Sequence, residues 1–232
     1  GRWEEDAPSV LMVGYVSPHH PFDPPAPYST MYDPEKLRLL DGYTQEALKR
    51  DVEANGTAMD YTSLSEGDVR AMMAAYYGMI SEIDDGIGRL IGLLKRKGLY
   101  ENTIVIYTSD NGCSPMADYP ELLSQGHNPS YVFRGTKADI YEGGHRIPLI
   151  VQWPDRVPEG RRCSRIVCLC DIMATMADIL GISLDAETAV DSVSNLPLWL
   201  NPDEEEVRAD LIHQSIDGSL SIRKGKFKLE MC

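Results

Sequence analysis

The chain has 232 residues, with 22 Lys and Arg against 36 Asp and Glu, so its formal net charge is −14. With 43% hydrophobic and 25% charged residues, the composition is typical of a globular protein and excludes collagen-like, coiled-coil and disordered classes. The longest strongly apolar stretches, Val10 to Val16 and Ile147 to Val151, are far shorter than the roughly 20 residues of a membrane-spanning helix. The negative charge also argues against nucleic acid or an anionic membrane as a partner.

The cysteines are odd in number and irregularly spaced, so a complete disulfide framework is not expected. Free thiols favour a reducing compartment, so the cytoplasm is weakly preferred, with the periplasm or secretion as alternatives. The pattern Cys168-Leu-Cys170 has no second Cys or His pair at zinc spacing, which favours buried free thiols over a metal site. The five cysteines are Cys113, Cys163, Cys168, Cys170 and Cys232.

The first half of the chain predicts a strand, a loop and a long helix. The apolar run from Val10 to Val16 is typical of a buried strand, and the proline-rich stretch from Pro18 to Pro34 predicts a loop. From Glu66 to Lys97, apolar residues recur at three- and four-residue spacing, which predicts an amphipathic helix. Ser65 is its expected N-cap and Gly98 its expected end.

The second half alternates strands and helices. Strands are expected over Thr103 to Ser109 and Ile147 to Trp153, and a helix over Asp171 to Leu180 with Asp171 as N-cap. Beyond Asn201 the acidic segment 202–206 predicts a linker, and Leu220 to Leu229 predicts a strand pair. The sequence therefore predicts an α/β fold, with one domain over residues 1–200 and the start of a small antiparallel β-rich unit over residues 201–232.

Asp110-Asn111-Gly112, directly after a predicted strand, is the most informative site in the sequence. A carboxylate and an amide oxygen side by side are hard ligands that suit Ca²⁺ or Mg²⁺. The alternative is a simple turn, since these residue types also end strands.

A second group of candidate residues is cationic or imidazole-bearing. Lys137, flanked by Arg134 and Arg146, suits an anion pocket, with a salt-bridged loop as the alternative. His19 and His127 lie in loops, where an imidazole can donate to an anion or move a proton.

Taken together, these motifs are similar to those of sulfatases, and their order along the chain is the same. The resemblance runs from about Val10 to Leu229 and identifies an arylsulfatase-type member of the alkaline-phosphatase superfamily. It implies a mixed sheet between helices with a smaller antiparallel C-terminal unit. The motifs are Ser17-Pro18-His19-His20-Pro21, Ile80 to Asp85, Thr108 to Gly112, Arg134 to Pro148, and Trp153-Pro154.

The resemblance implies a role for each candidate residue. Asp110 and Asn111 correspond to two ligands of a Ca²⁺ ion, with further ligands from an N-terminal Asp pair. Lys137 corresponds to the lysine that contacts the sulfate and the ester oxygen, His19 to a sulfate-binding or acid histidine, and His127 is a candidate substrate contact. The implied partner is a small aryl or sugar sulfate, whose identity the sequence does not give, and the oligomeric state is equally open.

One part of the family pattern is absent from this sequence. Sulfatases use a formylglycine made from the Cys or Ser of a Cys/Ser-x-Pro-x-Arg motif. After Cys113-Ser114-Pro115 the chain has Met116 and Ala117, so Cys113 is rejected as this residue. The nucleophile and the Asp pair are expected to precede Gly1 in a longer protein, so these 232 residues alone are expected to be inactive and to bind Ca²⁺ weakly.

Two other functions are retained as alternatives. One is a phosphomonoesterase, phosphodiesterase or phosphonate hydrolase of the same superfamily. For such an enzyme the resemblance implies an Asp-His pair suited to Zn²⁺ or Mn²⁺ at the position of Asp110 and Asn111, whereas Asn111 offers only an oxygen ligand. The other alternative is a non-catalytic binding protein derived from the sulfatase fold.

Overall fold

The computed structural model describes residues 7–19, 21–39, 64–114, 128–185, 187–201, 203 and 206–231. The chain forms two compact units, Gly1–Leu93 and Leu94–Cys232. The domain boundary expected between residues 200 and 201 stays a prediction. Among the described residues, no helix has the length and apolar character needed to cross a membrane.

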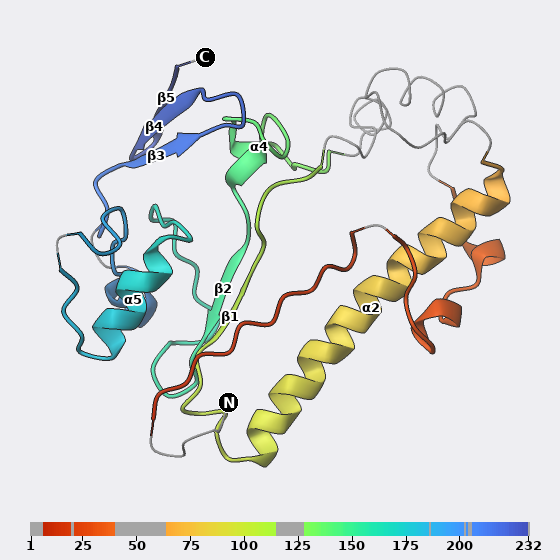
Figure 1. Cartoon of the computed structure of the whole chain (residues 1–232), viewed down its shortest axis with the longest axis horizontal. Helices are drawn as coiled ribbons and strands as arrows, with labels where there is room; N and C mark the ends of the chain where they lie inside the picture. The colour runs from red at the N-terminus through yellow and green to blue at the C-terminus, as the bar shows by residue number, and fades with distance from the viewer. Residues whose placement is uncertain are drawn as a thin grey trace. The chain divides into compact units, whose positions relative to one another are not determined.

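The main element of the first unit is α2 (Glu66–Arg96), shown in Figure 1. At its start, the Ser65 hydroxyl accepts from the Asp68 N–H at 3.2 Å while the Asp68 carboxylate accepts from the Ser65 N–H at 2.8 Å. This reciprocal pair satisfies backbone donors that a helix start leaves unpaired. Gly98 ends the helical run with φ +66°, as predicted.

The proline-rich loop packs on α2 through two short 3-10 helices, η1 (Tyr28–Thr30) and η2 (Pro34–Lys36). The Tyr28 ring is buried, and its hydroxyl donates to Asp85 on the helix. A Cβ at Gly78 would lie 2.5 Å from the Tyr28 carbonyl oxygen, so the glycine allows this close approach. The loop is therefore ordered against the helix.

The strand expected from Val10 to Val16 is not present. The segment has no regular secondary structure, and the Val10 side chain is 85% exposed. A strand is stabilised by hydrogen bonds to a neighbouring strand. Within the part of the chain that the structure describes, no strand pairs with this segment. The apolar run alone does not supply that partner.

The second unit contains a two-stranded antiparallel sheet of β1 (Val105–Thr108) and β2 (Leu149–Gln152). Both strands are shorter than predicted but lie at the predicted places. Thr108 pairs with Leu149, and the Thr108 hydroxyl donates to the Pro148 carbonyl at 2.9 Å. The residues that follow β1 therefore lie beside those that precede β2 (Figure 1).

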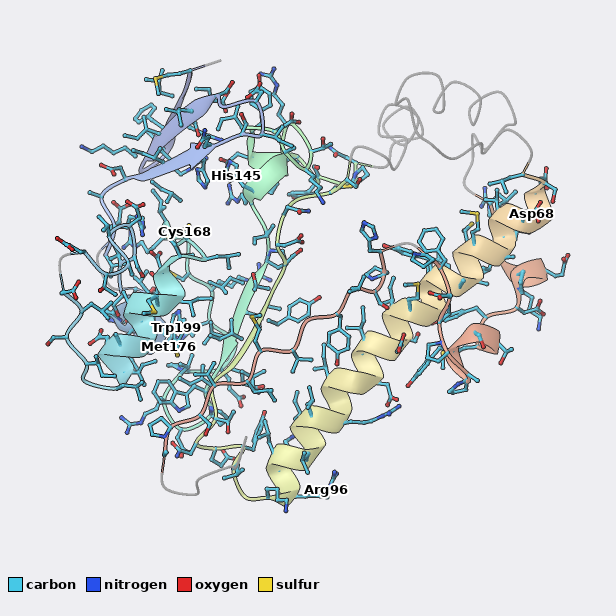
Figure 2. The ribbon with its side chains drawn as sticks, viewed as in Figure 1. Asp68, Arg96, His145, Cys168, Met176 and Trp199 are labelled. Atoms are coloured by element: carbon cyan, nitrogen blue, oxygen red, sulfur yellow. The ribbon has the colours of Figure 1, made fainter. Side chains whose placement is uncertain are left out.

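The helix α5 (Asp171–Ile179) packs on the short α6 (Leu196–Leu200), and the buried Trp199 lies at this contact (Figure 2). Asp171 is the first helical residue and not the N-cap, which is Cys170. The sequence assignment was wrong because the fully buried Asp171 carboxylate instead accepts from N–H groups outside the helix, at Cys168 (2.8 Å) and Val193 (3.0 Å).

A three-stranded antiparallel sheet follows, made of β3 (Leu211–Gln214), β4 (Leu220–Lys224) and β5 (Phe227–Met231). The β4–β5 pair confirms the prediction for this region, whereas β3 was not predicted. Most of the linker expected at 202–206 lies outside the described residues.

The two faces of this sheet differ in character. Its polar face packs on the short helix α4 (Glu142–His145), and the opposite apolar face is largely exposed. The polar face carries His213, Ser221, Arg223, Lys228 and Glu230, and the apolar face carries Ile212, Leu220, Ile222, Phe227, Leu229 and Met231.

Candidate functional site

Asp110 and Asn111 lie where the chain leaves β1. The Asp110 carboxylate is exposed, and Asn111 is half-buried. The Asn111 amide nitrogen donates to the Gly112 carbonyl at 3.0 Å, which leaves the amide oxygen as the ligating atom. The two side chains therefore offer adjacent hard oxygen atoms, and this donor set fits Ca²⁺.

The coordination shell that these two residues supply is partial. Within the described residues, no group of three or more His, Cys, Asp or Glu side chains is placed to hold a metal ion. Since Ca²⁺ takes six to eight oxygen ligands, a site at Asp110 and Asn111 requires further donors.

Glycines bring three segments into backbone contact beside this pair. The Gly112 N–H donates to the Gly144 carbonyl at 2.9 Å, and the Gly143 N–H donates to the Arg134 carbonyl at 2.7 Å. A Cβ on Gly112 would lie 1.7 Å from the Gly143 oxygen, and one on Gly143 would lie 1.9 Å from the Gly135 oxygen. We call Gly112, Gly135, Gly143 and Gly144 the glycine crossing, because no larger residue permits these distances.

Lys137 is fixed relative to the candidate calcium ligands through its backbone. Its N–H donates to the Cys113 carbonyl at 2.7 Å, two residues beyond Asn111. The turn that carries it is held by the Asp139 carboxylate, which accepts from the Thr136 N–H at 2.7 Å. The Lys137 side chain is exposed, so its ammonium group is available to a ligand from solvent.

A cavity of about 240 Å³ opens beside Asn111. The sequence analysis did not identify its aromatic wall, because Tyr131 and Phe133 come together with Arg146 only through the fold. The signal in the sequence was the pair of aromatic residues two positions apart just before Arg134. Its lining residues include Asn111, Cys113, Ser130, Tyr131, Phe133 and Arg146.

The other sequence candidates stand as follows. His19 is exposed in the first unit, where its N–H donates to the Val16 carbonyl at 3.0 Å, and its role stays a prediction. His127 lies outside the described residues.

Burial raises the pKa of the Cys113 thiol, which disfavours the thiolate and agrees with the rejection of Cys113 as a nucleophile. The described cysteines Cys113, Cys163, Cys168 and Cys170 are free, but the expected burial of the Cys168 and Cys170 thiols was wrong, since Cys168 is half-buried and Cys170 is exposed.

A charged cluster attaches α4 to the polar face of the C-terminal sheet. Glu142 forms ion pairs with Arg223 (2.5 Å) and Lys228 (3.4 Å), and the rings of His145 and His213 stack with centroids 3.9 Å apart. Figure 2 shows His145 on the side of α4 that faces the strands. Glu142 and His145 directly flank Gly143 and Gly144 in sequence, so the cluster anchors that part of the glycine crossing.

The environment of this cluster favours charged Glu142 and neutral histidines. Burial opposes ionisation of Glu142, but its hydrogen bond with Arg223 and the positive charges of Arg223 and Lys228 hold its pKa below the usual value. Burial and the charge of Lys228 lower the pKa of His145. Burial, followed by the charges of His145 and Lys228, lowers the pKa of His213 to about 4.

Comparison with known proteins identifies the family. The family model described as Sulfatase matches residues 3–182. The chain belongs to the sulfatase family. This sulfatase chain is 35% identical over 155 residues to an N-acetylgalactosamine-6-O-sulfatase of Bacteroides thetaiotaomicron, covering 65% of this chain and 30% of the relative. It is 33% identical over 204 residues to an arylsulfatase of Clostridium perfringens, covering 85% and 38%.

Among solved structures, the sulfatase chain is similar to a phosphonate monoester hydrolase from Silicibacter pomeroyi. The TM-score is 0.61 at 23% identity, covering 93% of this chain and 46% of the other. This likeness concerns the fold alone, and it confirms the predicted α/β fold class. The sulfatase chain spans between 30% and 38% of the length of the two curated relatives named above.

Proposed function

We propose that the protein containing this chain hydrolyses a sulfate monoester. The observation that carries the proposal is the hydrogen bond between the Lys137 N–H and the Cys113 carbonyl, which ties the backbone of a cationic residue to the segment that carries Asp110 and Asn111. Membership of the sulfatase family supports it. The relatives named for sugar and aryl sulfates support a small sulfated substrate.

Each residue of the site has a distinct task in this proposal. The oxygens of Asp110 and Asn111 hold Ca²⁺ together with donors from outside this chain. When bound, the ion supplies positive charge that stabilises the transferring sulfate group. The Lys137 ammonium binds a sulfate oxygen and the ester oxygen, where negative charge develops as the bond breaks. His19 either binds the sulfate or donates a proton to the leaving oxygen, and His127 contacts the substrate.

The nucleophile in this proposal is a formylglycine that belongs to the protein outside these 232 residues. Cys113 does not replace it, since the residues that follow lack the required Arg and burial raises the pKa of the thiol. The chain described here supplies binding, orientation and charge stabilisation.

Phosphonate or phosphate ester hydrolysis is the second candidate, favoured by the similarity to a phosphonate monoester hydrolase at the level of the fold. Asn111 argues against it, because an amide oxygen suits Ca²⁺ better than the Zn²⁺ or Mn²⁺ that imidazole ligands bind.

The test uses the full-length protein with 4-nitrophenyl sulfate, 4-nitrophenyl phosphate and 4-nitrophenyl phenylphosphonate. We expect Ca²⁺-dependent turnover of the sulfate, and a decrease of kcat/KM of roughly a hundredfold in Lys137→Ala through loss of charge stabilisation. Lys224→Ala, which removes another exposed lysine from the same unit, is the matched control and should keep the activity.

Three outcomes would count against the proposal. Preferred turnover of the phosphate or phosphonate would support the second candidate function instead of sulfate ester hydrolysis. Unchanged turnover in Lys137→Ala would remove Lys137 from the mechanism. If no ester is hydrolysed but a sulfated ligand is bound, the non-catalytic alternative is supported.

A further inference from the structure

Three side chains form a continuous ladder at the cavity beside Asn111. The rings of Tyr131 and Phe133 meet edge to face with centroids 6.0 Å apart. The Arg146 guanidinium lies over the Phe133 ring, 4.5 Å from its centroid. All three residues line the cavity, so an apolar wall and a cationic group face the same space.

The Tyr131 ring is presented to solvent by an ordered loop. The Asn128 carbonyl accepts from the Tyr131 N–H at 2.9 Å, and the Ser130 carbonyl accepts from the Phe133 N–H at 3.0 Å. The buried Ser130 hydroxyl donates to the Gly135 carbonyl at 3.0 Å, which connects the loop to the glycine crossing.

Tyr131 itself has an unfavourable conformation. Its φ is +58°, a region that costs a non-glycine residue about 1 kcal/mol or more. Its side chain is nevertheless 72% exposed, so burial of the ring does not offset this cost. Residues kept in strained conformations are concentrated at ligand-binding positions.

The wall lies next to the reaction centre of the proposed function. The same cavity is lined by Asn111, a candidate calcium ligand, and by Cys113, whose carbonyl holds the Lys137 backbone. A sulfate ester bound at Asn111 therefore has its alcohol part beside the cavity.

We propose that Tyr131, Phe133 and Arg146 form a sugar subsite that receives the pyranose ring carrying the sulfate ester. This inference rests on the proposed function and assigns its substrate to the class of sugar sulfates. A pyranose has an apolar C–H face and a rim of hydroxyl groups, so it requires an aromatic wall and a hydrogen-bond donor together. Tyr131 and Phe133 supply the wall.

Arg146 supplies the donors at the rim of the ring. One of its terminal nitrogens, Nη1, lies 3.3 Å from the Glu142 carboxylate, which orients the guanidinium. A guanidinium has five N–H donors, so this single contact leaves capacity for sugar hydroxyls. An aryl ring would use the aromatic wall but would leave these donors without an acceptor.

The test compares Tyr131→Ala, Tyr131→Phe and Phe227→Ala in the full-length protein. Phe227 is equally exposed, lies in β5 of the same unit and does not line the cavity, so its variant is the matched control. Kinetics with N-acetylgalactosamine 6-sulfate and 4-nitrophenyl sulfate give KM and kcat. An NMR titration with unsulfated N-acetylgalactosamine gives a Kd that does not depend on turnover.

In Tyr131→Ala we expect the KM for the sugar sulfate and the Kd for the unsulfated sugar to rise roughly three- to tenfold, with kcat within about twofold. Tyr131→Phe keeps the ring and should restore both values, and Phe227→Ala should change neither. The KM for the aryl sulfate should rise less than that for the sugar sulfate.

Each contrary outcome has a distinct meaning. An unchanged Kd in Tyr131→Ala, or no saturable titration in the unmodified protein, would overturn the sugar subsite. A larger effect on the aryl sulfate would assign the wall to aryl esters and would also overturn it. If no sulfate ester is hydrolysed, the proposed function fails, while the titration still decides whether Tyr131 binds a sugar.

Discussion

The residues that determine the geometry of the candidate site most strictly have no side chain. Gly112 and Gly143 lie where one backbone passes directly over another, and in both cases a methyl group would overlap a carbonyl oxygen. The overlap involves backbone on both sides, so rotation of a side chain cannot relieve it.

Gly112→Ala should therefore lower the free energy of unfolding by about 3 kcal/mol or more, a large effect for a single methyl group. Gly88→Ala is the control, because Gly88 lies in α2 with nothing within 4 Å of an added Cβ. That change should stabilise the protein by up to about 1 kcal/mol. Urea unfolding measures both, and equal midpoints for the two variants would contradict the backbone contact.

A second contrast at this scale involves two arginine–aspartate pairs. In the Arg208–Asp171 pair the side chains are 9% and 0% exposed, whereas in the Arg161–Asp203 pair they are 57% and 80% exposed. Truncating one partner of a buried pair leaves an uncompensated charge in the interior.

Arg208→Ala should lower the free energy of unfolding by about 3 kcal/mol, because it leaves the Asp171 carboxylate charged and buried. Arg161→Ala should change it by less than about 0.5 kcal/mol. Chemical denaturation at neutral pH gives both values. A small effect in Arg208→Ala would show that the remaining donors, the backbone N–H groups and the Asn195 amide, satisfy Asp171.

Individual residues were predictable from sequence where chemistry and position coincide. Asp110, Asn111 and Lys137 could be proposed from the sequence because their residue types suit a cation and an anion and follow a strand or a glycine-rich turn, and their roles stay predictions. Tyr131 and Phe133 were missed, since their meeting with Arg146 depends on a turn at Tyr131 that no local pattern indicates. The role of Asp171 was also missed, because its partner Val193 lies far along the chain.

At the scale of elements, the contact between α4 and the C-terminal sheet makes stability depend on pH. The groups that face the stacked His145 and His213 are Glu142 on α4 and Arg223, Lys228 and Glu230 on the sheet. Burial is the main effect that opposes protonation of the histidines, and the positive charges of Lys228 and Arg223 add to it.

Burial lowers the pKa of His213 to about 4 in the folded chain, compared with about 6.5 in the unfolded chain. The unfolded chain therefore binds more protons between these values, so stability is full above pH 6.5 and falls as the pH decreases towards 4. We expect a loss of about 1 kcal/mol between pH 7 and pH 5 after allowing for solvent screening.

His213→Phe keeps a flat ring in the stack but cannot be protonated, so it should reduce this loss. Urea unfolding at several pH values, monitored by tryptophan fluorescence to which Trp153 and Trp199 of the second unit contribute, measures the effect. An unchanged pH dependence in the variant would assign the loss to other groups.

Elements were predicted well where one segment determines its own structure. The helix α2 has its periodicity, N-cap and terminal glycine within one stretch of sequence, and the β4–β5 pair is joined by a short turn. The segment Val10 to Val16 has strand-like composition, but a strand also depends on a neighbour from elsewhere in the chain. Sequence composition carries no information on that neighbour.

At the scale of the whole molecule, the C-terminal sheet has an unusual distribution of polarity. In β5, Lys228 and Glu230 face α4, while Phe227, Leu229 and Met231 face outwards. Alternation in the sequence predicts that two faces differ but does not determine which face is covered. Here the ion pairs with Glu142 hold the polar face inward.

Because the apolar face packs on little within the described residues, lysine should be tolerated there. Phe227→Lys combined with Leu229→Lys should change the melting temperature by only a few degrees, while binding of a hydrophobic dye decreases. Calorimetry and dye fluorescence on the same samples measure the two quantities. A drop of more than about 10 °C would show that this face is covered in solution.

The fold class could be predicted because the family motifs occur in series along the chain, and the match of the family model over residues 3–182 agrees with this. The antiparallel pairing of β1 with β2 and the position of β3 were not predictable in the same way. Both depend on long-range pairing, which residue patterns within a segment do not record.

The glycine crossing also separates what can vary in this protein from what cannot. Its contacts join backbone to backbone, so replacing one of its glycines by a larger residue would disrupt the geometry of the candidate site. The loop that carries Tyr131 and Val132 is joined to the glycine crossing by the hydrogen bond from the Ser130 hydroxyl to the Gly135 carbonyl, and both residues are 72% exposed. The side chains at these two positions can therefore change without moving the backbone that carries Asp110, Asn111 and Lys137.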